Sequence, residues 1–160
     1  MAPALSLAAL VIALDQATKW AILTWVMDPP RVIDVTGFFN LVLVWNRGIS
    51  FGVMNNHGEW NAAILSALAL VIAGSLTWWL RRAETRWQRL ALPLIIGGAI
   101  GNVIDRLIHG AVVDFVDLSI AGYHWPAFNV ADAAITVGAI LLLIDTLVHR
   151  PPVGTDKAGG

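Results

Sequence analysis

The stretch Trp60–Leu80, WNAAILSALALVIAGSLTWWL, decides the fold because its twenty-one residues include no formal charge. A helix needs about 20 apolar residues to cross about 30 Å of hydrocarbon. Glu59 and Arg81 bound the stretch, so the charge-free segment has the length of one membrane crossing. The sequence therefore predicts a transmembrane helix over 60–80.

The composition of the whole chain agrees with a protein whose solvent is lipid. Of the 160 residues, 58% are hydrophobic and 13% are charged, and the mean hydropathy is +0.71. Soluble domains carry about twice this share of charged residues. The apolar content excludes a disordered chain, and the absence of cysteine excludes a disulfide scaffold. A net charge of −1 leaves no basic footprint for nucleic acid.

Three further apolar stretches predict membrane crossings, although each contains ionisable residues. They cover about 4–27, 90–107 and 126–148, so we expect an α-helical integral membrane protein with four transmembrane helices. The first stretch is expected to be a permanent span, because residues 1–14 lack the basic region of a signal peptide. Residues 1–150 then form a single membrane domain, followed by a disordered cytoplasmic tail over 151–160.

The basic residues predict how the chain is oriented in the membrane. The short link between the second and third spans is crowded by four arginines: Arg81, Arg82, Arg86 and Arg89. The positive-inside rule places this link and both termini in the cytoplasm. The loops 28–59 and 108–125 are then expected to lie outside, in a chain that crosses the membrane several times.

The first outer loop predicts β-structure. Val32–Val35 and Phe38–Val44 are rich in β-branched and aromatic residues, with Gly37 as a turn signal between them. Residues 48–53 are a candidate continuation of the sheet, and 55–58 predict a polar turn. Tryptophans at the expected outer ends resemble an aromatic belt: Trp25, Trp45, Trp60 and Trp125. We therefore expect a small extracytoplasmic β-cradle on the four helices.

Ionisable side chains inside a membrane are costly, so each needs a partner or a function. Asp15 and Lys19 are spaced i,i+4 with the acid first, the better orientation for a helical ion pair. This spacing favours a neutral pair that braces the bundle, with substrate contact as the alternative. Gly97, Gly98 and Gly101 predict close packing of the third span against its neighbours.

The outer end of the third span carries a polar cluster. Asn102 and Asp105 share a helix face through i,i+3 spacing. Arg106 follows Asp105 directly and is expected to neutralise it or another nearby carboxylate. A structural role and a catalytic role are both open for this cluster.

Asp114 and Asp132 have no adjacent cation in the sequence, and both are expected near the outer boundary. Asp132 is six residues past Pro126, which places it about 9 Å into the fourth span. Two carboxyls that meet in an apolar setting share one proton. Such a pair suits peptide hydrolysis, because one acid activates water while the other polarises the scissile carbonyl. The spacing leaves open whether the two aspartates meet, and a structural or ion-relay role is the alternative.

The other candidate groups rank lower. Asp105 is the second choice of partner for Asp132, Asp117 is expected in an exposed loop, and Asp145 is expected at the cytoplasmic edge. The sequence has no cysteine nucleophile, no His-Glu-x-x-His zinc motif and no Gly-x-Ser-x-Gly elbow. Neither a metal nor an organic cofactor is predicted.

Five motifs occur in an order that resembles one family. They are Asp15–Lys19 (DQATK), Asn46–Gly52 (NRGISFG), Gly98–Arg106 (GAIGNVIDR), Val112–Phe115 (VVDF) and Phe128–Asp132 (FNVAD). Together they closely resemble the bacterial lipoprotein signal peptidases, or type II signal peptidases, over about residues 5–148. The sequence departs from the family pattern at Arg47-Gly48-Ile49-Ser50, where many members have small residues around the glycine.

The resemblance implies an aspartyl endopeptidase that removes the signal peptide of a prolipoprotein, cutting before the diacylglyceryl-modified cysteine. It implies that Asp114 and Asp132 are catalytic. Supporting or substrate-binding roles fall on Asp15, Lys19, Asn46, Arg47, Gly48, Asn102, Asp105, Arg106 and Asn129. It implies four transmembrane helices with a β-cradle, and no cofactor. The expected partners are diacylglyceryl-modified prolipoproteins and membrane lipid, around a chain expected to be a monomer.

A small membrane transporter or proton-relay protein is the alternative from another class. It predicts ionisable residues spread through the depth of the membrane, whereas most acids here fall near the span ends and only Asp15 near a middle. A non-catalytic lipid-binding scaffold is a third possibility. It predicts that Asp114→Asn and Asp132→Asn have no effect on any cleavage.

Overall fold

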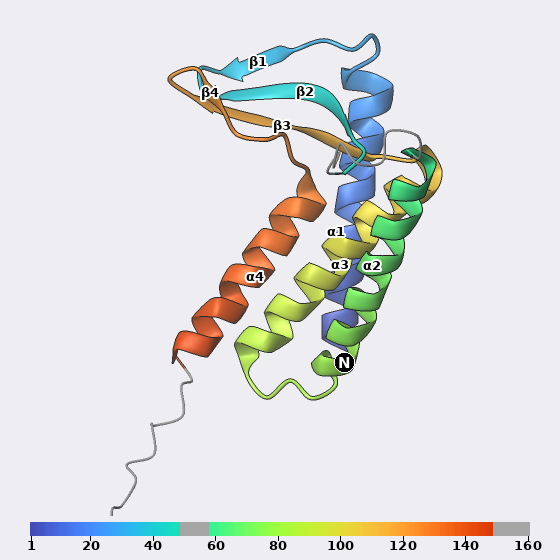
Figure 1. The fold of residues 1–160 in the computed structure, drawn as a ribbon. Helices are drawn as coiled ribbons and strands as arrows, with labels where there is room; N and C mark the ends of the chain where they lie inside the picture. The colour runs from blue at the N-terminus through green and yellow to red at the C-terminus, as the bar shows by residue number, and fades with distance from the viewer. Residues whose placement is uncertain (49–57, 149–160) are drawn as a thin grey trace, which may run out of the picture.

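The computed structural model describes residues 1–48 and 58–148, which form a helical bundle with a small sheet at one end (Figure 1). The helices are α1 (Ala2–Ala21), its π-helical continuation η1 (Ile22–Val26), α2 (Gly58–Leu80), α3 (Arg86–His109) and α4 (Val130–Val148). Within this described part of the chain, four helical segments have the length and hydropathy of membrane crossings: Ala2–Val26, Trp60–Leu80, Arg86–His109 and Val130–Val148. The prediction of four transmembrane helices is confirmed.

The sheet is antiparallel, with the strand order β1-β2-β3-β4. Its strands are β1 (Ile33–Thr36), β2 (Phe39–Asn46), β3 (Val112–Ile120) and β4 (Tyr123–His124). The first two confirm the strands predicted on either side of Gly37. Gly48 follows β2 outside any strand, and the other expectations for 49–57, like those for the tail, concern positions outside the described residues.

The pattern of the second outer loop predicted no strand, yet β3 is one of the two inner strands of the sheet. Its first four residues, Val112–Phe115, are all buried. A strand buried on both faces loses the alternation of apolar and polar residues by which strands are recognised. This strand holds Asp114 at the place where the sheet meets the helices.

α3 packs against each of the other three long helices. Its glycines permit this, because a Cβ at Gly97 would lie 2.7 Å from the carbonyl oxygen of Ala8 in α1, and one at Gly98 would collide with the carbonyl of Ala131 in α4. The close packing predicted for this glycine stripe is confirmed.

Two helices begin at other positions than predicted. α3 starts at Arg86 rather than near residue 90, because the Thr85 hydroxyl caps it by accepting a hydrogen bond from the Gln88 amide at 3.1 Å. α4 starts at Val130 rather than Pro126. The backbone of Phe128 instead pairs with that of Val116 at 2.9 and 3.0 Å, which keeps this segment extended.

Two other acids have burial and partners that the sequence did not predict. Asp145 is buried, and its carboxylate accepts a hydrogen bond from the Gln88 amide nitrogen at 2.9 Å because α3 packs beside α4. Asp117 is buried in β3 rather than exposed in a loop. Hydrogen bonds from Asn40 and His124, at 2.8 and 2.9 Å, hold the pKa of Asp117 below its usual value.

Candidate active site

Asp114 and Asp132 come together where the sheet meets the helices. Asp114 lies on β3 and is 1% exposed, whereas Asp132 lies in the first turn of α4 and is half-buried. The prediction that Asp132 lies about 9 Å into the fourth span is wrong, because α4 begins only two residues before it. Asp132 is therefore at the end of the helix rather than inside it.

Asn129 joins the two aspartates. Its Nδ2 donates to Asp114 Oδ1 at 2.7 Å, and its backbone N–H donates to Asp132 Oδ2 at 3.3 Å. In return, the Asp132 backbone N–H donates to Asn129 Oδ1 at 2.9 Å. The two exchanged bonds form a capping box, in which Asn129 is the N-cap of α4 and Asp132 is its third residue. The same asparagine that caps the start of α4 therefore also holds both carboxyls in place.

The surroundings of Asp114 favour its protonated form. Burial, together with the nearby charge of Asp132, raises the pKa of this carboxyl to about 6, although hydrogen bonds from Asn46 and Asn129 oppose the shift. Asn46 Nδ2 donates to Asp114 Oδ2 at 2.9 Å from the end of β2. Both oxygens of Asp114 therefore accept bonds from amides.

Asn102 connects the site to the interior of the bundle. Its Nδ2 donates to Asp132 Oδ1 at 2.8 Å. Its Oδ1 accepts bonds from Lys19 Nζ at 3.1 Å and from Asn129 Nδ2 at 3.3 Å. These contacts orient the Asn102 amide, because Lys19 can only donate. The second oxygen of Asp132 is thereby supplied with a defined donor.

Lys19 lies between two carboxylates, with its Nζ 2.8 Å from Asp15 Oδ2 and 2.8 Å from Asp105 Oδ2. The three side chains are at most 3% exposed. The ion pair predicted for Asp15 and Lys19 is confirmed. Asp105 turns towards α1 and forms its ion pair with Lys19 rather than with Arg106. The alternative prediction, that Arg106 acts on another nearby carboxylate, agrees with its electrostatic interaction with Asp132.

The two acids of this cluster also bind backbone. Asp15 Oδ1 accepts the N–H of Ala131, the second residue of α4, at 2.9 Å. Asp105 Oδ2 accepts the N–H of Val113 in β3 at 3.0 Å. The buried charges therefore fix the chain directly beside both aspartates of the site.

Gln16 is a member of the cluster that the sequence reading did not single out. Its Nε2 donates to Asp105 Oδ1 at 2.9 Å and to the carbonyl of Gly101 at 3.2 Å. Its position directly after Asp15 in the first motif was the feature of the sequence that could have indicated this role. Gln16 adds a second link between α1 and α3.

The remaining predicted supporting residues make no hydrogen bond to Asp114 or Asp132 in the described part of the chain: Arg47, Gly48 and Arg106. Arg106 Nη1 donates to the Asn102 carbonyl at 3.3 Å, while its buried Nε has no hydrogen-bond partner in the described part of the chain. Gly48 has a positive φ of 87°, and its N–H donates to Asn46 Oδ1 at 2.9 Å, which orients Asn46. Arg47 is exposed, and within residues 1–48 and 58–148 it makes no ion pair or hydrogen bond by its side chain.

A cavity of about 430 Å³ opens beside Asp132. Asn46 and Thr136 provide polar groups at its wall, and the remaining wall is mainly apolar: Leu118, Trp125, Pro126, Ala127, Phe128 and Ala133. Binding sites for small ligands have similar volumes and a similar mixture of apolar walls with few polar groups. Among the described residues, no three histidines or acids are placed to hold a metal.

Comparison with known proteins identifies the family of this membrane protein. The family model described as signal peptidase (SPase) II matches residues 7–148. This chain belongs to the signal peptidase II family. Lipoprotein signal peptidases from Ralstonia nicotianae and Azoarcus sp. are 50% and 48% identical to it, over 91% and 98% of this chain and 84% and 91% of those proteins.

Solved structures agree with this membership. A bacterial membrane enzyme solved at 1.9 Å resolution superposes with a TM-score of 0.82 and 30% identity, covering 94% of this chain and 96% of that chain. A second, solved at 2.3 Å, has a TM-score of 0.81 and 28% identity, with 99% and 96% covered. This signal peptidase II is thus a lipoprotein-processing protease of the bacterial inner membrane. The family membership decides against the transporter and the scaffold.

We expect Lys19→Met to lower the stability of this signal peptidase II markedly, because Asp15 and Asp105 would remain buried without their shared cation. Removing one partner of a buried ion pair costs about 3–5 kcal/mol. Thermal unfolding in detergent measures the effect.

The matched control is the double variant Lys19→Met/Asp105→Asn, in which one buried charge is removed together with the lysine. It should recover part of the lost stability. An unchanged unfolding temperature in the single variant would contradict the bracing role of Lys19.

Proposed function

We propose that this enzyme cuts its prolipoprotein substrate by activating water between Asp114 and Asp132, just before the diacylglyceryl-modified cysteine. The observation that carries the proposal is that Asn129 binds both carboxyls, one of which, Asp132, lines a cavity. Neither aspartate needs a metal for this chemistry, because two carboxyls can perform both proton transfers.

The two carboxyls have different environments, which supports different roles. Asp132 lines the cavity and is half-buried, so water can reach it. Asp114 is 1% exposed, and its pKa of about 6 favours the proton there. In the proposed mechanism, ionised Asp132 takes a proton from water, and the resulting hydroxide attacks the scissile carbonyl carbon. Protonated Asp114 donates a hydrogen bond to the carbonyl oxygen as its negative charge develops.

Collapse of the tetrahedral intermediate completes the reaction. The C–N bond breaks, and the leaving amine receives the proton that Asp132 took from water. The products are a free carboxyl group on the signal peptide and a free amino group on the lipid-modified cysteine. Because both aspartates end in the state in which they began, the pair is ready for another cycle.

The cavity supports a substrate that is itself part of the membrane. Trp125, Phe128 and Leu118 form apolar wall next to Asp132, which suits the residues around a lipid-modified cysteine. About 430 Å³ is the volume of a small ligand. We infer that the acyl chains stay in the bilayer.

Asp114→Asn and Asp132→Asn should each reduce cleavage of a lipidated precursor by roughly 10²–10⁴-fold, because each removes a group that transfers or holds a proton. The measurement is turnover of purified variants in detergent, with thermal unfolding as a check of folding.

Asp117→Asn is the matched control for these variants. It changes the same residue type on the same strand, three positions away and bonded to Asn40 and His124 instead of the site. It should cleave at close to the normal rate. Near-normal turnover by a folded Asp114→Asn or Asp132→Asn variant would refute the dyad.

The pH dependence follows from the proton on Asp114. The value of kcat/KM should fall as the pH rises through about 6, since Asp114 then loses the proton that polarises the carbonyl. Asn46→Ala removes a hydrogen bond that lowers this pKa, so the descending limb should move to higher pH. A limb that Asn46→Ala leaves in place would argue against Asp114 as its origin.

The protonation of Asp114 should also make the stability of the folded protein depend on pH, in a direction that its raised pKa fixes. The folded-state pKa of about 6 lies above the ordinary aspartate value of 3.8, so the folded protein holds this proton more tightly than the unfolded chain does. The stabilisation is complete below about 3.8 and is lost as the pH rises through about 6. Asp114→Asn should remove this pH-dependent contribution to thermal unfolding.

We infer that the sheet and the site lie on the outer side of the membrane, with the α2–α3 link and the N-terminus in the cytoplasm. Figure 1 shows the sheet at one end of the bundle and the link and N-terminus at the other. The arginines of and beside this link support a cytoplasmic position.

A membrane-impermeant maleimide tests this orientation, because the natural chain has no cysteine. It should label exposed Tyr123→Cys on the sheet in intact spheroplasts, and should label exposed Glu84→Cys in the link only after lysis. The reverse pattern would contradict the orientation.

A further inference from the structure

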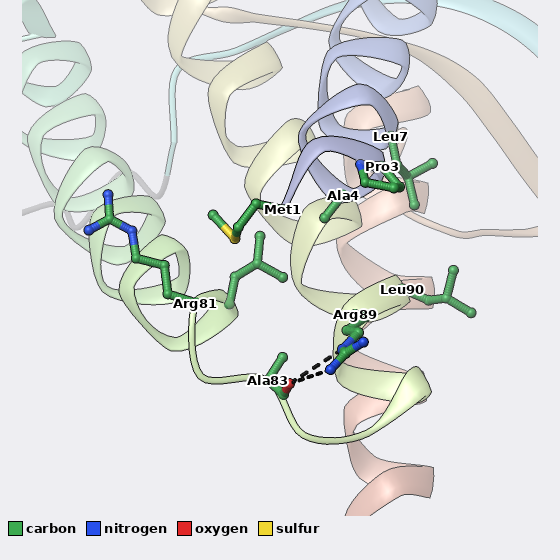
Figure 2. Close-up of a pocket in the computed structure, with 9 residues that line it drawn as sticks. Met1, Pro3, Ala4, Leu7, Arg81, Ala83, Arg89 and Leu90 are labelled. Atoms are coloured by element: carbon green, nitrogen blue, oxygen red, sulfur yellow. Dashed lines mark hydrogen bonds between the residues drawn. The ribbon is translucent and has the colours of Figure 1, made fainter.

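A second cavity lies at the end of the bundle far from the sheet, where the start of α1 meets the end of α2 and the start of α3 (Figure 2). Its volume is about 400 Å³. Leu7, Leu80 and Leu90 contribute apolar wall from three different helices, and Arg81 and Arg89 contribute cationic side chains. The cavity is therefore amphipathic, and it lies where a helix bundle of this kind leaves the hydrocarbon.

Among the residues that the structure describes, the positive charges at this cavity have no anionic partner. Arg89 donates to the carbonyl of Ala83 from Nε and Nη2, each at 3.3 Å, and a neutral carbonyl does not compensate its charge. Over residues 1–48 and 58–148, neither Arg81 nor Arg89 forms an ion pair. Figure 2 shows the Arg81 side chain extending away from Arg89, so it would rotate to meet the same anion.

The two neighbouring arginines differ from this pair. Arg82 lies over the Trp78 ring, 4.2 Å from its centroid, and Arg86 lies 5.4 Å from the centroid of Trp87. Neither lines the cavity. The four arginines are thus two cavity residues and two residues stacked on tryptophan, although the sequence shows them only as one basic cluster.

We propose that this cavity binds an anionic phospholipid of the membrane, with the phosphate at Arg89 and Arg81 and an acyl chain against Leu7, Leu80 and Leu90. A guanidinium offers paired donors that match the oxygens of a phosphate. The apolar wall favours a lipid over free phosphate, which would leave that wall in contact with water. Leu90 is 49% exposed, so the acyl chain can continue from the cavity into the bilayer.

The occupant would contact several parts of the bundle at once. The cavity brings residues of α1 beside the α2–α3 link, and a lipid seated there would touch both. Binding of the lipid is therefore expected to raise the thermal stability of the protein. It should not alter the contacts of Asp114 and Asp132, which lie at the other end of the bundle. This separates the inference from the cleavage mechanism.

The test titrates the purified full-length chain in detergent with dioleoyl phosphatidylglycerol, dioleoyl phosphatidylcholine or inorganic phosphate, and follows thermal unfolding and native mass spectrometry. Only phosphatidylglycerol should raise the unfolding temperature and remain bound. Arg89→Gln should weaken its binding by more than about tenfold, as expected for the loss of a charged hydrogen-bond donor.

Arg82→Gln is the matched control, because it removes the same charge at the same end of the bundle without altering the cavity wall. General attraction to an anionic surface accounts for only about fivefold per charge. Equal weakening by Arg89→Gln and Arg82→Gln would overturn the proposal in favour of a diffuse basic surface. Equal stabilisation by inorganic phosphate would overturn the lipid as the ligand.

A second variant tests the apolar part of the site. Ala4→Phe fills the cavity from α1 and keeps every arginine, so phosphatidylglycerol binding should fall while precursor cleavage in detergent stays close to normal. Retained cleavage shows that the variant is folded. Full lipid binding by such a folded variant would also overturn the proposal, because the acyl chain would then lie elsewhere.

Discussion

The structure of this signal peptidase II depends on one buried ammonium group held between two carboxylates. An unpaired charge inside a membrane protein is costly, so Lys19 holds Asp15 and Asp105 within 2.8 Å and thereby joins α1 to α3. The remaining oxygens of those acids bind the backbone of Ala131 and Val113. These two residues directly precede Asp132 and Asp114, so a charge cluster inside the bundle positions the two acids of the site.

The asparagines extend this order to the reactive groups. Asn102 contacts Lys19 on one side and Asp132 on the other, and Asn129 binds both aspartates while it starts α4. With donors and acceptors fixed in this way, Asp114 can be buried without losing its hydrogen bonds. Burial then raises the pKa of Asp114 well above its ordinary value. The hydrogen bonds by which Asn129 caps α4 are therefore part of the set that holds the two aspartates in place.

Local patterns were sufficient for the features that arise from local chemistry. The charge-free run over 60–80 predicted a membrane helix, and the β-branched residues around Gly37 predicted β1 and β2. The i,i+4 spacing of Asp15 and Lys19 predicted their ion pair. The pairing of Asp105 could not be read in this way, because its adjacent cation, Arg106, suggested a partner that the fold does not use.

The sequence by itself determined that the chain lies in a lipid membrane and that it has four membrane helices. Through five ordered motifs it also indicated the family and the candidate site residues. These follow from composition, helix length and residue order, which need no knowledge of distant contacts. Only the tertiary structure decided that Phe128 pairs with Val116, so that α4 begins at Val130 and Asp132 stands at its first turn. It also decided that Asn129 binds both aspartates, because contacts between separate elements depend on how helices and sheet pack together.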